Sequence, residues 1–283
     1  MGLRIRTNVE SLTAQRQLSG NNADLNKSSE RLASGYRINK SADDAAGLAI
    51  SENLNAKVRG LNQAKRNAND GVSLIQVTEG GLNEVTNIMG RLRELTVQAA
   101  SDTIGDKERG YLQKEYGQLV DEVDRISATT EFNGLKLMGP QNAAGGLKIQ
   151  VGYNGSADDS LSLALGDAPD GISAEALKIK GTSVAGQDRE AIAGNLQVLD
   201  SAMEIIQNSR ATMGATQSRL TSTIANISVS TENMSAAASR IKDVDFAEEA
   251  AKSTQARILS QAGLSVLSQA NQRPEMALSL LRN

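Results

Sequence analysis

The sequence predicts a mainly α-helical protein, in which an elongated antiparallel bundle of long helices carries a terminal coiled coil and a small β-hairpin insert. Three observations lead to this fold class. Apolar residues recur every seven positions from residue 192 to residue 241. The only prolines are Pro140, Pro169 and Pro274, which leaves long stretches free of the strongest helix breaker. Aromatic residues make up 2% of the chain, so its core must consist of aliphatic side chains that suit close helix packing.

The first predicted helix ends near Gly35, a residue type that often terminates helices. Its apolar residues follow two heptad tracks that differ by a phase slip of one residue: Ile5, Val9 and Leu12, then Leu18, Leu25 and Leu32. Ser41 and Asp44 form the S-x-x-D pattern of a helix N-terminus. A second long helix should therefore start there, and its heptad track continues from Leu54 to Thr96, so that it ends near residues 103–105.

A third, shorter helix should fold back against the second, because apolar residues such as Leu112, Tyr116 and Val123 repeat at spacings of three and four. The pattern then changes to alternation. Asn133-Gly134 is a hairpin turn sequence, and alternating apolar residues at 147–151 and 161–165 predict a second hairpin. The Gly-rich stretch from about 139 to 186 is thus expected to be a small, exposed, β-containing insert.

The fourth helix should cover about residues 187–241 and the fifth should end at Pro274. The heptad stripe of the fourth helix consists of Ile192, Leu199, Ile206, Met213, Leu220, Ile227, Met234 and Ile241. Small residues follow the first seven stripe residues by three positions: Asn195, Ala202, Ser209, Thr216, Thr223, Ser230 and Ala237. This row favours a closely packed seam. Simple antiparallel pairing matches residues 45–100 with 187–241 and joins the two chain ends.

Composition argues against an enzyme. The chain contains no Cys and no His, which removes thiol nucleophiles, imidazole bases and common metal ligands. The acidic pairs at 43–44, 158–159 and 248–249 are interpreted as caps, turns or solvated faces, and the acids around Asp243 lack the glycine of a calcium loop. We therefore predict no catalytic, cofactor-binding or metal-binding residues and no cofactor.

Partners are also limited by charge and hydropathy. A net charge of −3 argues against nucleic-acid binding, and no stretch approaches 18 uninterrupted apolar residues, so membrane insertion is not expected. The first residues lack the apolar segment of a cleavable secretory signal, so export would use another route.

Three strings resemble bacterial flagellin. SGYRINKSADDAAGL at 34–48 resembles the family's junction between its first two helices, and ATTEFNGLKL at 128–137 resembles the turn after its third helix. Residues 261–272 with 278–282 look like the family's C-terminus. The resemblance covers nearly the whole chain except about 140–190.

This resemblance implies a secreted structural subunit that self-assembles into the extracellular flagellar filament for swimming motility. It implies a helical homopolymer that also meets the flagellar cap and the hook–filament junction proteins. It further implies an export chaperone and unfolded passage through the flagellar type III apparatus. Residues 1–40 with 245–283 would form an inner coiled-coil domain, and 41–244 a long-helix bundle domain with a short variable insert at about 132–186.

Two groups of site residues are expected. The residues for subunit packing and assembly are Ile5, Leu12, Leu18, Leu25, Leu32, Leu220, Ile227, Met234, Ile241, Leu259, Val266, Leu267, Leu280 and Leu281. The segment RLRELTVQ at 91–98 resembles the segment of many flagellins that Toll-like receptor 5 recognises, with Arg91, Leu95 and Glu115 on its key positions. The resemblance thus implies a monomer that this receptor binds.

Two alternative functions are weighed against the filament subunit. One is a hook–filament junction protein of the same superfamily, and the other is a secreted helical effector or adhesin that binds host partners through coiled coils. About 40 residues at each end have apolar stripes but too little area to pack alone. We expect them to be largely disordered in the monomer and helical in the polymer.

Overall fold

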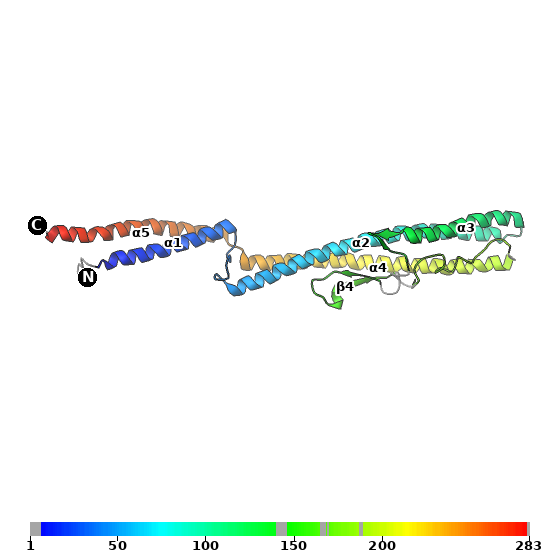
Figure 1. The fold of residues 1–283 in the computed structure, drawn as a ribbon, viewed down its shortest axis with the longest axis horizontal. Coiled ribbons are helices and arrows are strands. Elements are labelled where there is room, and N and C mark those ends of the chain that lie inside the picture. The colour runs from blue at the N-terminus through cyan, green and yellow to red at the C-terminus, as the bar shows by residue number, and fades with distance from the viewer. Residues whose placement is uncertain (1–6, 140–145, 165–167, 169, 187–188, 282–283) are drawn as a thin grey trace. The chain divides into compact units, whose positions relative to one another are not determined.

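The predicted fold class is confirmed by the computed structural model, which describes residues 7–139, 146–164, 168, 170–186 and 189–281. Within these residues the chain forms the α-helices α1 (Val9–Ser34), α2 (Ala45–Ala99), α3 (Asp106–Thr129), α4 (Arg189–Lys242) and α5 (Phe246–Leu281) (Figure 1). Strands β1 (Glu131–Phe132) and β2 (Leu135–Lys136) form one two-stranded sheet, and β3 (Leu147–Gln150) and β4 (Ser160–Leu163) form another. None of the described helices is both long and apolar enough to cross a membrane.

The chain divides into two compact units, and each is described by itself. One unit comprises Met1–Lys57 with Asn233–Asn283, and the other comprises Val58–Glu232. The unit with both chain ends thus contains residues 41–57 and 233–244 in addition to the predicted inner domain. The assignment of residues 1–40 and 245–283 to an inner layer concerns the assembled state and stays a prediction.

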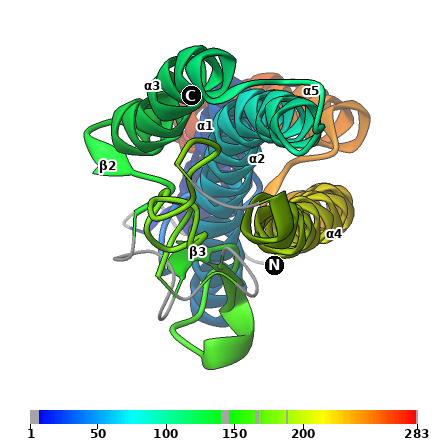
Figure 2. The ribbon, with the colours of Figure 1, turned by 90° about the vertical axis from the view of Figure 1, so that its right-hand side faces the viewer.

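In the unit Val58–Glu232, the heptad stripe of α4 packs against the matching track of α2. Leu199, Ile206 and Leu220 of α4 are fully buried, as are Ile75 and Leu82 of α2. Such interdigitation of aliphatic side chains removes apolar surface from water and holds the two helices together. Figure 2 shows α2, α3 and α4 side by side. The antiparallel pairing expected from the sequence is therefore confirmed, and the residues of the small row at 202, 209 and 216 are buried with the stripe.

The two hairpins lie where alternation predicted them. Asn133 and Gly134 connect β1 to β2 with φ angles of 52° and 78°, the left-handed values that a tight hairpin turn of this kind requires. Leu147 pairs with Leu163 across the second hairpin. This hairpin docks on α2 at a glycine, because a side chain at Gly71 would collide with the end of Ile149.

The insert is not exposed throughout, which corrects the prediction both for the apolar residues of its hairpin and for its second half. Ile172, Ile179 and Val184 are fully buried in the same core as α2 and α4. Side chains of α3 hold this segment: the Asp124 carboxylate accepts the backbone N–H of residue 174 at 2.7 Å, and the Gln113 side chain accepts that of Val184 at 2.7 Å. The three helices leave apolar surface uncovered, and this segment covers it.

Three helix boundaries differ from the expectation. Asp44, rather than Ser41, caps α2, since its Oδ1 accepts the backbone N–H of Gly47 at 2.9 Å. Helix α2 ends at Ala99, a few residues before the predicted stop. Helix α5 does not end at Pro274 but continues to Leu281.

Candidate assembly surfaces

The pair of helices α1 and α5 has a narrow seam of small side chains. Heptad positions on both helices meet there, and its most buried members are Ser11, Ser28, Ser253, Ala256 and Ala270. The predicted packing residues Leu18, Leu25, Leu32 and Leu267 are half-buried at the same seam. A Cβ added at Gly263 would lie 3.4 Å from the Leu18 side chain, so the helices approach closely at this point. Small residues allow this approach but bury little apolar area.

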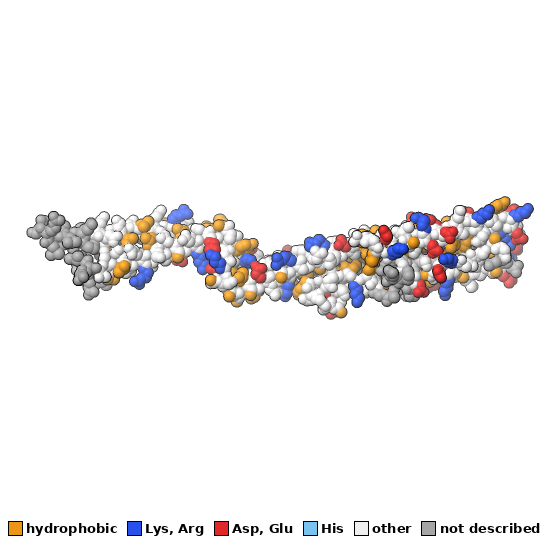
Figure 3. Space-filling model, viewed as in Figure 1, with side chains coloured by type: hydrophobic (Ala, Val, Ile, Leu, Met, Phe, Trp, Pro, Cys, Tyr) orange, Lys and Arg blue, Asp and Glu red, His pale blue; other side chains and the backbone are white. Residues whose placement is uncertain are grey.

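Several other large apolar residues of this helix pair lie exposed outside the seam. Ile258 is 60% exposed and Leu259 45%, and Val9, Leu12, Leu264 and Val266 are exposed as well. Residues 258–272 contain no charged residue. Figure 3 shows apolar side chains spread over α1 and α5 with few charged ones among them. Exposing such a continuous apolar surface to water is unfavourable, so a surface of this kind is typical of a face that binds another molecule.

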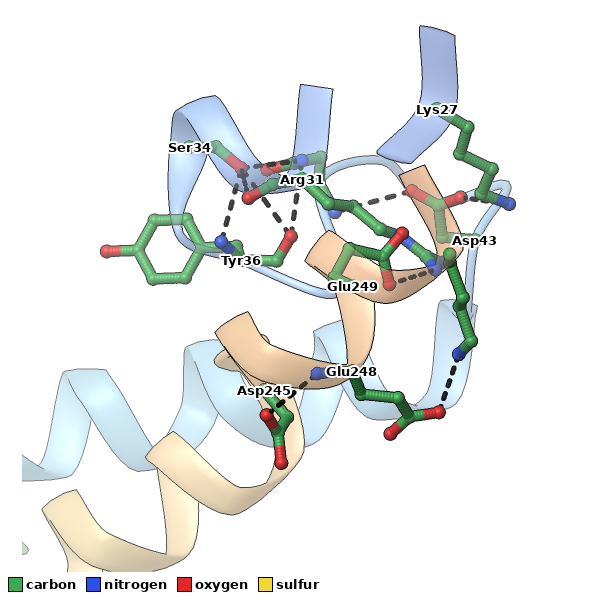
Figure 4. Close-up of polar contacts among 10 residues, drawn as sticks. Lys27, Arg31, Ser34, Tyr36, Asp43, Asp245, Glu248 and Glu249 are labelled. Carbon is green, nitrogen blue, oxygen red and sulfur yellow. Dashed lines mark hydrogen bonds and ion pairs between the residues drawn. The ribbon is translucent and has the colours of Figure 1, made fainter. Parts of the chain in front are cut away.

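The junction between the helices is held by polar contacts (Figure 4). The connector after α1 pairs with the connector after α4: the Arg37 N–H donates to the Lys242 carbonyl at 2.7 Å, and the Val244 N–H donates to the Gly35 carbonyl at 3.0 Å. The buried Glu249 carboxylate lies 3.7 Å from the Arg31 guanidinium. These contacts fix where the chain turns from the terminal helices into α2 and α4.

Each acidic pair has a structural partner, as interpreted from the sequence. Lys27 lies 2.9 Å from Asp43, and this hydrogen bond lowers the pKa of the Asp43 carboxyl to about 2 despite some opposing desolvation. Lys252 pairs with Glu248 at 2.7 Å. Asp245 caps α5 by accepting the backbone N–H of Ala247 at 3.0 Å, and Asp159 accepts from a nearby hydroxyl in a turn. Among the described residues no acidic cluster has the arrangement of a metal site.

Apart from the four leucines half-buried at the seam, the predicted assembly residues fall into three groups. Leu12, Leu259 and Val266 are exposed and therefore free to contact another molecule. Leu220 and Ile227 are buried inside the unit of α2–α4, whereas Met234 and Ile241 are half-buried. Ile5 lies outside the described residues, and the last two, Leu280 and Leu281, lie in α5 with side chains outside the description.

The predicted receptor residues do not share one environment. The Arg91 side chain is 48% exposed and lies 2.8 Å from Glu115 of α3, whose side chain is 45% exposed. Arg91 also lies 3.0 Å from Glu94, and hydrogen bonds to both acids raise the pKa of its guanidinium. Leu95 is fully buried in the core. Arg91 and Glu115 are thus accessible on the surface of this unit, whereas Leu95 is part of its core.

Sequence reasoning missed the hydrogen bonds that cross the α1–α5 seam. The Asn8 side chain donates to the Ala270 carbonyl at 2.7 Å, and the Ser260 hydroxyl donates to the Asn22 side chain at 2.9 Å. Asn8 also caps α1, and an asparagine directly before an amphipathic stretch is a recognisable cap signal. Nothing in the sequence around Asn8 indicates the hydrogen bond that its side chain makes to α5.

Comparison with known proteins gives full-length matches. The family model of the bacterial flagellin N-terminal helical region matches residues 5–143, and that of the bacterial flagellin C-terminal helical region matches residues 196–281. A flagellin of Halalkalibacterium halodurans is 40% identical over 281 residues, which cover 98% of this chain and 99% of that protein. A flagellin of Bacillus subtilis is 41% identical over 311 residues, with coverage of 99% and 100%.

Two solved structures are also similar. That of Bacillus cereus flagellin is 30% identical with a TM-score of 0.49, and the match covers 61% of this chain and 94% of that one. A structure from Vibrio parahaemolyticus that carries the description flagellar hook-associated protein is 13% identical with a TM-score of 0.56. Its match covers 71% of this chain and 100% of that one, and it supports the fold alone.

Proposed function

Since this chain belongs to the bacterial flagellin family, it is a structural, non-enzymatic subunit of the extracellular flagellar filament, and we propose how it is exported, assembled and recognised. The observation that carries the proposal for assembly is the exposed apolar surface of α1 and α5. Burying one such aliphatic side chain contributes about 1.5 to 3 kcal/mol, so several per subunit can drive polymerisation. Copies of the same chain are the partners that complete this surface.

In the proposed assembly, residues 1–40 and 245–283 form the inner layer of the filament, and residues 41–244 form the layer around it. Leu12, Leu259 and Val266 contact neighbouring subunits, because their side chains are exposed on one copy. Leu220 and Ile227 act differently, since they hold α2 and α4 together within each subunit.

Export is proposed to occur through the flagellar type III apparatus, with the chain unfolded. The absence of cysteine from the sequence supports this route, because no disulfide can cross-link the threaded chain. An export chaperone would shield the apolar faces of α1 and α5 until the subunit reaches the growing end. The cap and the hook–filament junction proteins are the further partners proposed for that end.

Seeded polymerisation tests the proposed function. Purified monomer is mixed with fragments of its own filaments, and the sedimentable fraction is measured over time and imaged by electron microscopy. We expect long filaments to grow from the seeds. A chain that stays monomeric with seeds and in precipitating salt would instead fit a helical effector or adhesin, the alternative from outside the family.

Receptor recognition of the monomer is a second proposal. Arg91 and Glu115 support it, because this ion pair of α2 and α3 is about half exposed on the described surface. Toll-like receptor 5 would bind the pair on the monomer, and assembly would cover it. The buried Leu95 would contribute by fixing the position of Arg91 one turn away.

Replacing Arg91 with alanine is expected to lower receptor signalling by the monomer about tenfold or more, because truncation of an arginine at the centre of an interface costs ~2 kcal/mol. The measurement is a dose–response curve in reporter cells. Arg125→Ala is the control: Arg125 lies on α3 outside the segment 91–98, is 60% exposed and also pairs with a glutamate, Glu122. Equal curves for the two variants would remove the pair from the recognition site.

A further inference from the structure

Helix α5 contains a proline in its interior, and the structure shows how the resulting defect is repaired. Pro274 has no N–H, so the carbonyl four residues earlier, that of Ala270, lacks the donor that a regular helix supplies. Ala270 is only 6% exposed, so water has little access to this carbonyl. An unpaired carbonyl buried in this way is unfavourable, and it would be expected to end the helix.

The missing donor comes from the other end of the chain. The Asn8 Nδ2 donates to the Ala270 carbonyl oxygen at 2.7 Å. The Oδ1 of the same side chain accepts the backbone N–H of Ser11 at 3.1 Å and thereby caps α1. The Ser11 hydroxyl then donates to the Asn271 side chain at 2.8 Å. One asparagine thus begins α1 and replaces a hydrogen bond that Pro274 removes from α5.

Near the junction the Arg31–Glu249 pair and the connector hydrogen bonds set the register of the seam, but toward the chain ends the seam gives little other reason for one register. Its buried residues are serines and alanines, which resemble one another in size and allow the helices to slide past each other at low cost. Polar groups that must be satisfied distinguish one register from the next. The Ser260–Asn22 bond on the same seam points to the same alignment.

We propose that Asn8 and Pro274 act as an end clamp, in which helical order beyond Ala270 depends on docking of the first turn of α1. Pro274 makes the last part of α5 unfavourable by itself, and Asn8 removes that penalty only when the two chain ends lie in register. The clamp makes ordering of the two ends mutual. It goes beyond the proposed function, although its test uses filaments and so rests on that function.

A double-mutant cycle tests the clamp. Filaments of the full chain are compared for Asn8→Ser, Pro274→Ala, the double variant and the parent, and amide hydrogen exchange is followed by mass spectrometry. Serine caps a helix about as well as asparagine but is too short to keep the bond to Ala270. The Pro274→Ala substitution restores the intrahelical N–H. Asn26→Ser on an exposed face of α1 is the control for the substitution itself.

With Pro274 present, Asn8→Ser is expected to speed exchange in the peptide covering residues 264–281 about five- to tenfold, as for loss of one buried hydrogen bond. In the Pro274→Ala background the effect should fall below about twofold, because the Ala270 carbonyl then has its own donor. Because the ordering is mutual, exchange at the start of α1 should rise by a similar factor with Pro274 present and change little in the Pro274→Ala background.

An equal effect of Asn8→Ser in both backgrounds, or faster exchange confined to the start of α1, would overturn the clamp and leave Asn8 as a cap alone. The parent chain is first scored for filaments by sedimentation, and failure at that step contradicts the proposed function. Filaments that form without coupling overturn the clamp alone; the cycle is scored on filaments because the two ends are expected to be disordered in the monomer.

Discussion

Replacing Leu220 with aspartate is expected to unfold the bundle of α2 and α4 and thereby to abolish filaments. Leu220 is fully buried on the stripe of α4 and lies against α2 near Gly71. The substitution removes apolar contacts and places an unpaired charge in the core, and such changes cost more than about 4 kcal/mol. Thermal unfolding followed by circular dichroism measures this loss.

Two control variants show whether the loss of stability comes from the charge itself or from its buried position. Thr221→Asp places the same charge one residue further along α4, at an exposed position, and should alter the free energy of unfolding by less than about 0.5 kcal/mol. Leu220→Met keeps the volume and should cost less than about 1.5 kcal/mol. If the Leu220→Asp protein were stable and formed filaments, burial of the stripe of α4 would not be what holds the bundle together.

Replacing Leu259 with aspartate is expected to abolish assembly while the monomer stays folded. Leu259 is 45% exposed on α5, outside the seam with α1, so the charge is solvated in the monomer. In a filament this charge would be buried against another copy. Because apolar burial is lost and the charge must be desolvated, we expect the critical concentration for assembly to rise at least about 100-fold. Sedimentation over a range of concentrations measures this value.

Leu259→Met is the matched variant, because it retains an apolar side chain of similar volume and should assemble almost normally. The melting temperature of all three proteins should agree within a few degrees. If Leu259→Asp assembled at the parent concentration, the exposed face of α5 would not be a contact between subunits.

The sequence was sufficient for those parts of the fold that repeat. The heptad track through Leu82 on α2 and the stripe through Leu199 on α4 identify faces that pack together, because burial at a spacing of seven needs no knowledge of distant residues. Asn133-Gly134 identified its hairpin for a similar reason, since the left-handed turn depends on those two residues.

Features that depend on distant partners were not predicted. The segment containing Ile172 and Ile179 was predicted to be exposed because glycine and proline are frequent near it, yet side chains of α3 hold it in the core. Pro274 was expected to stop α5, and no local rule could reveal a donor from Asn8. Leu95 could have been placed correctly, since it lies three residues after the buried Leu92.

Limited proteolysis of monomer and filament tests the central claim, which is that copies of the chain complete the apolar surface of its two ends. Both forms are digested at the same protease-to-protein ratio, and the cleavage sites are mapped by mass spectrometry. The account predicts rapid cleavage within about residues 1–40 and 245–283 of the monomer and resistance of the same segments in the filament. Ends that are equally resistant, or equally sensitive, in the two states would contradict it.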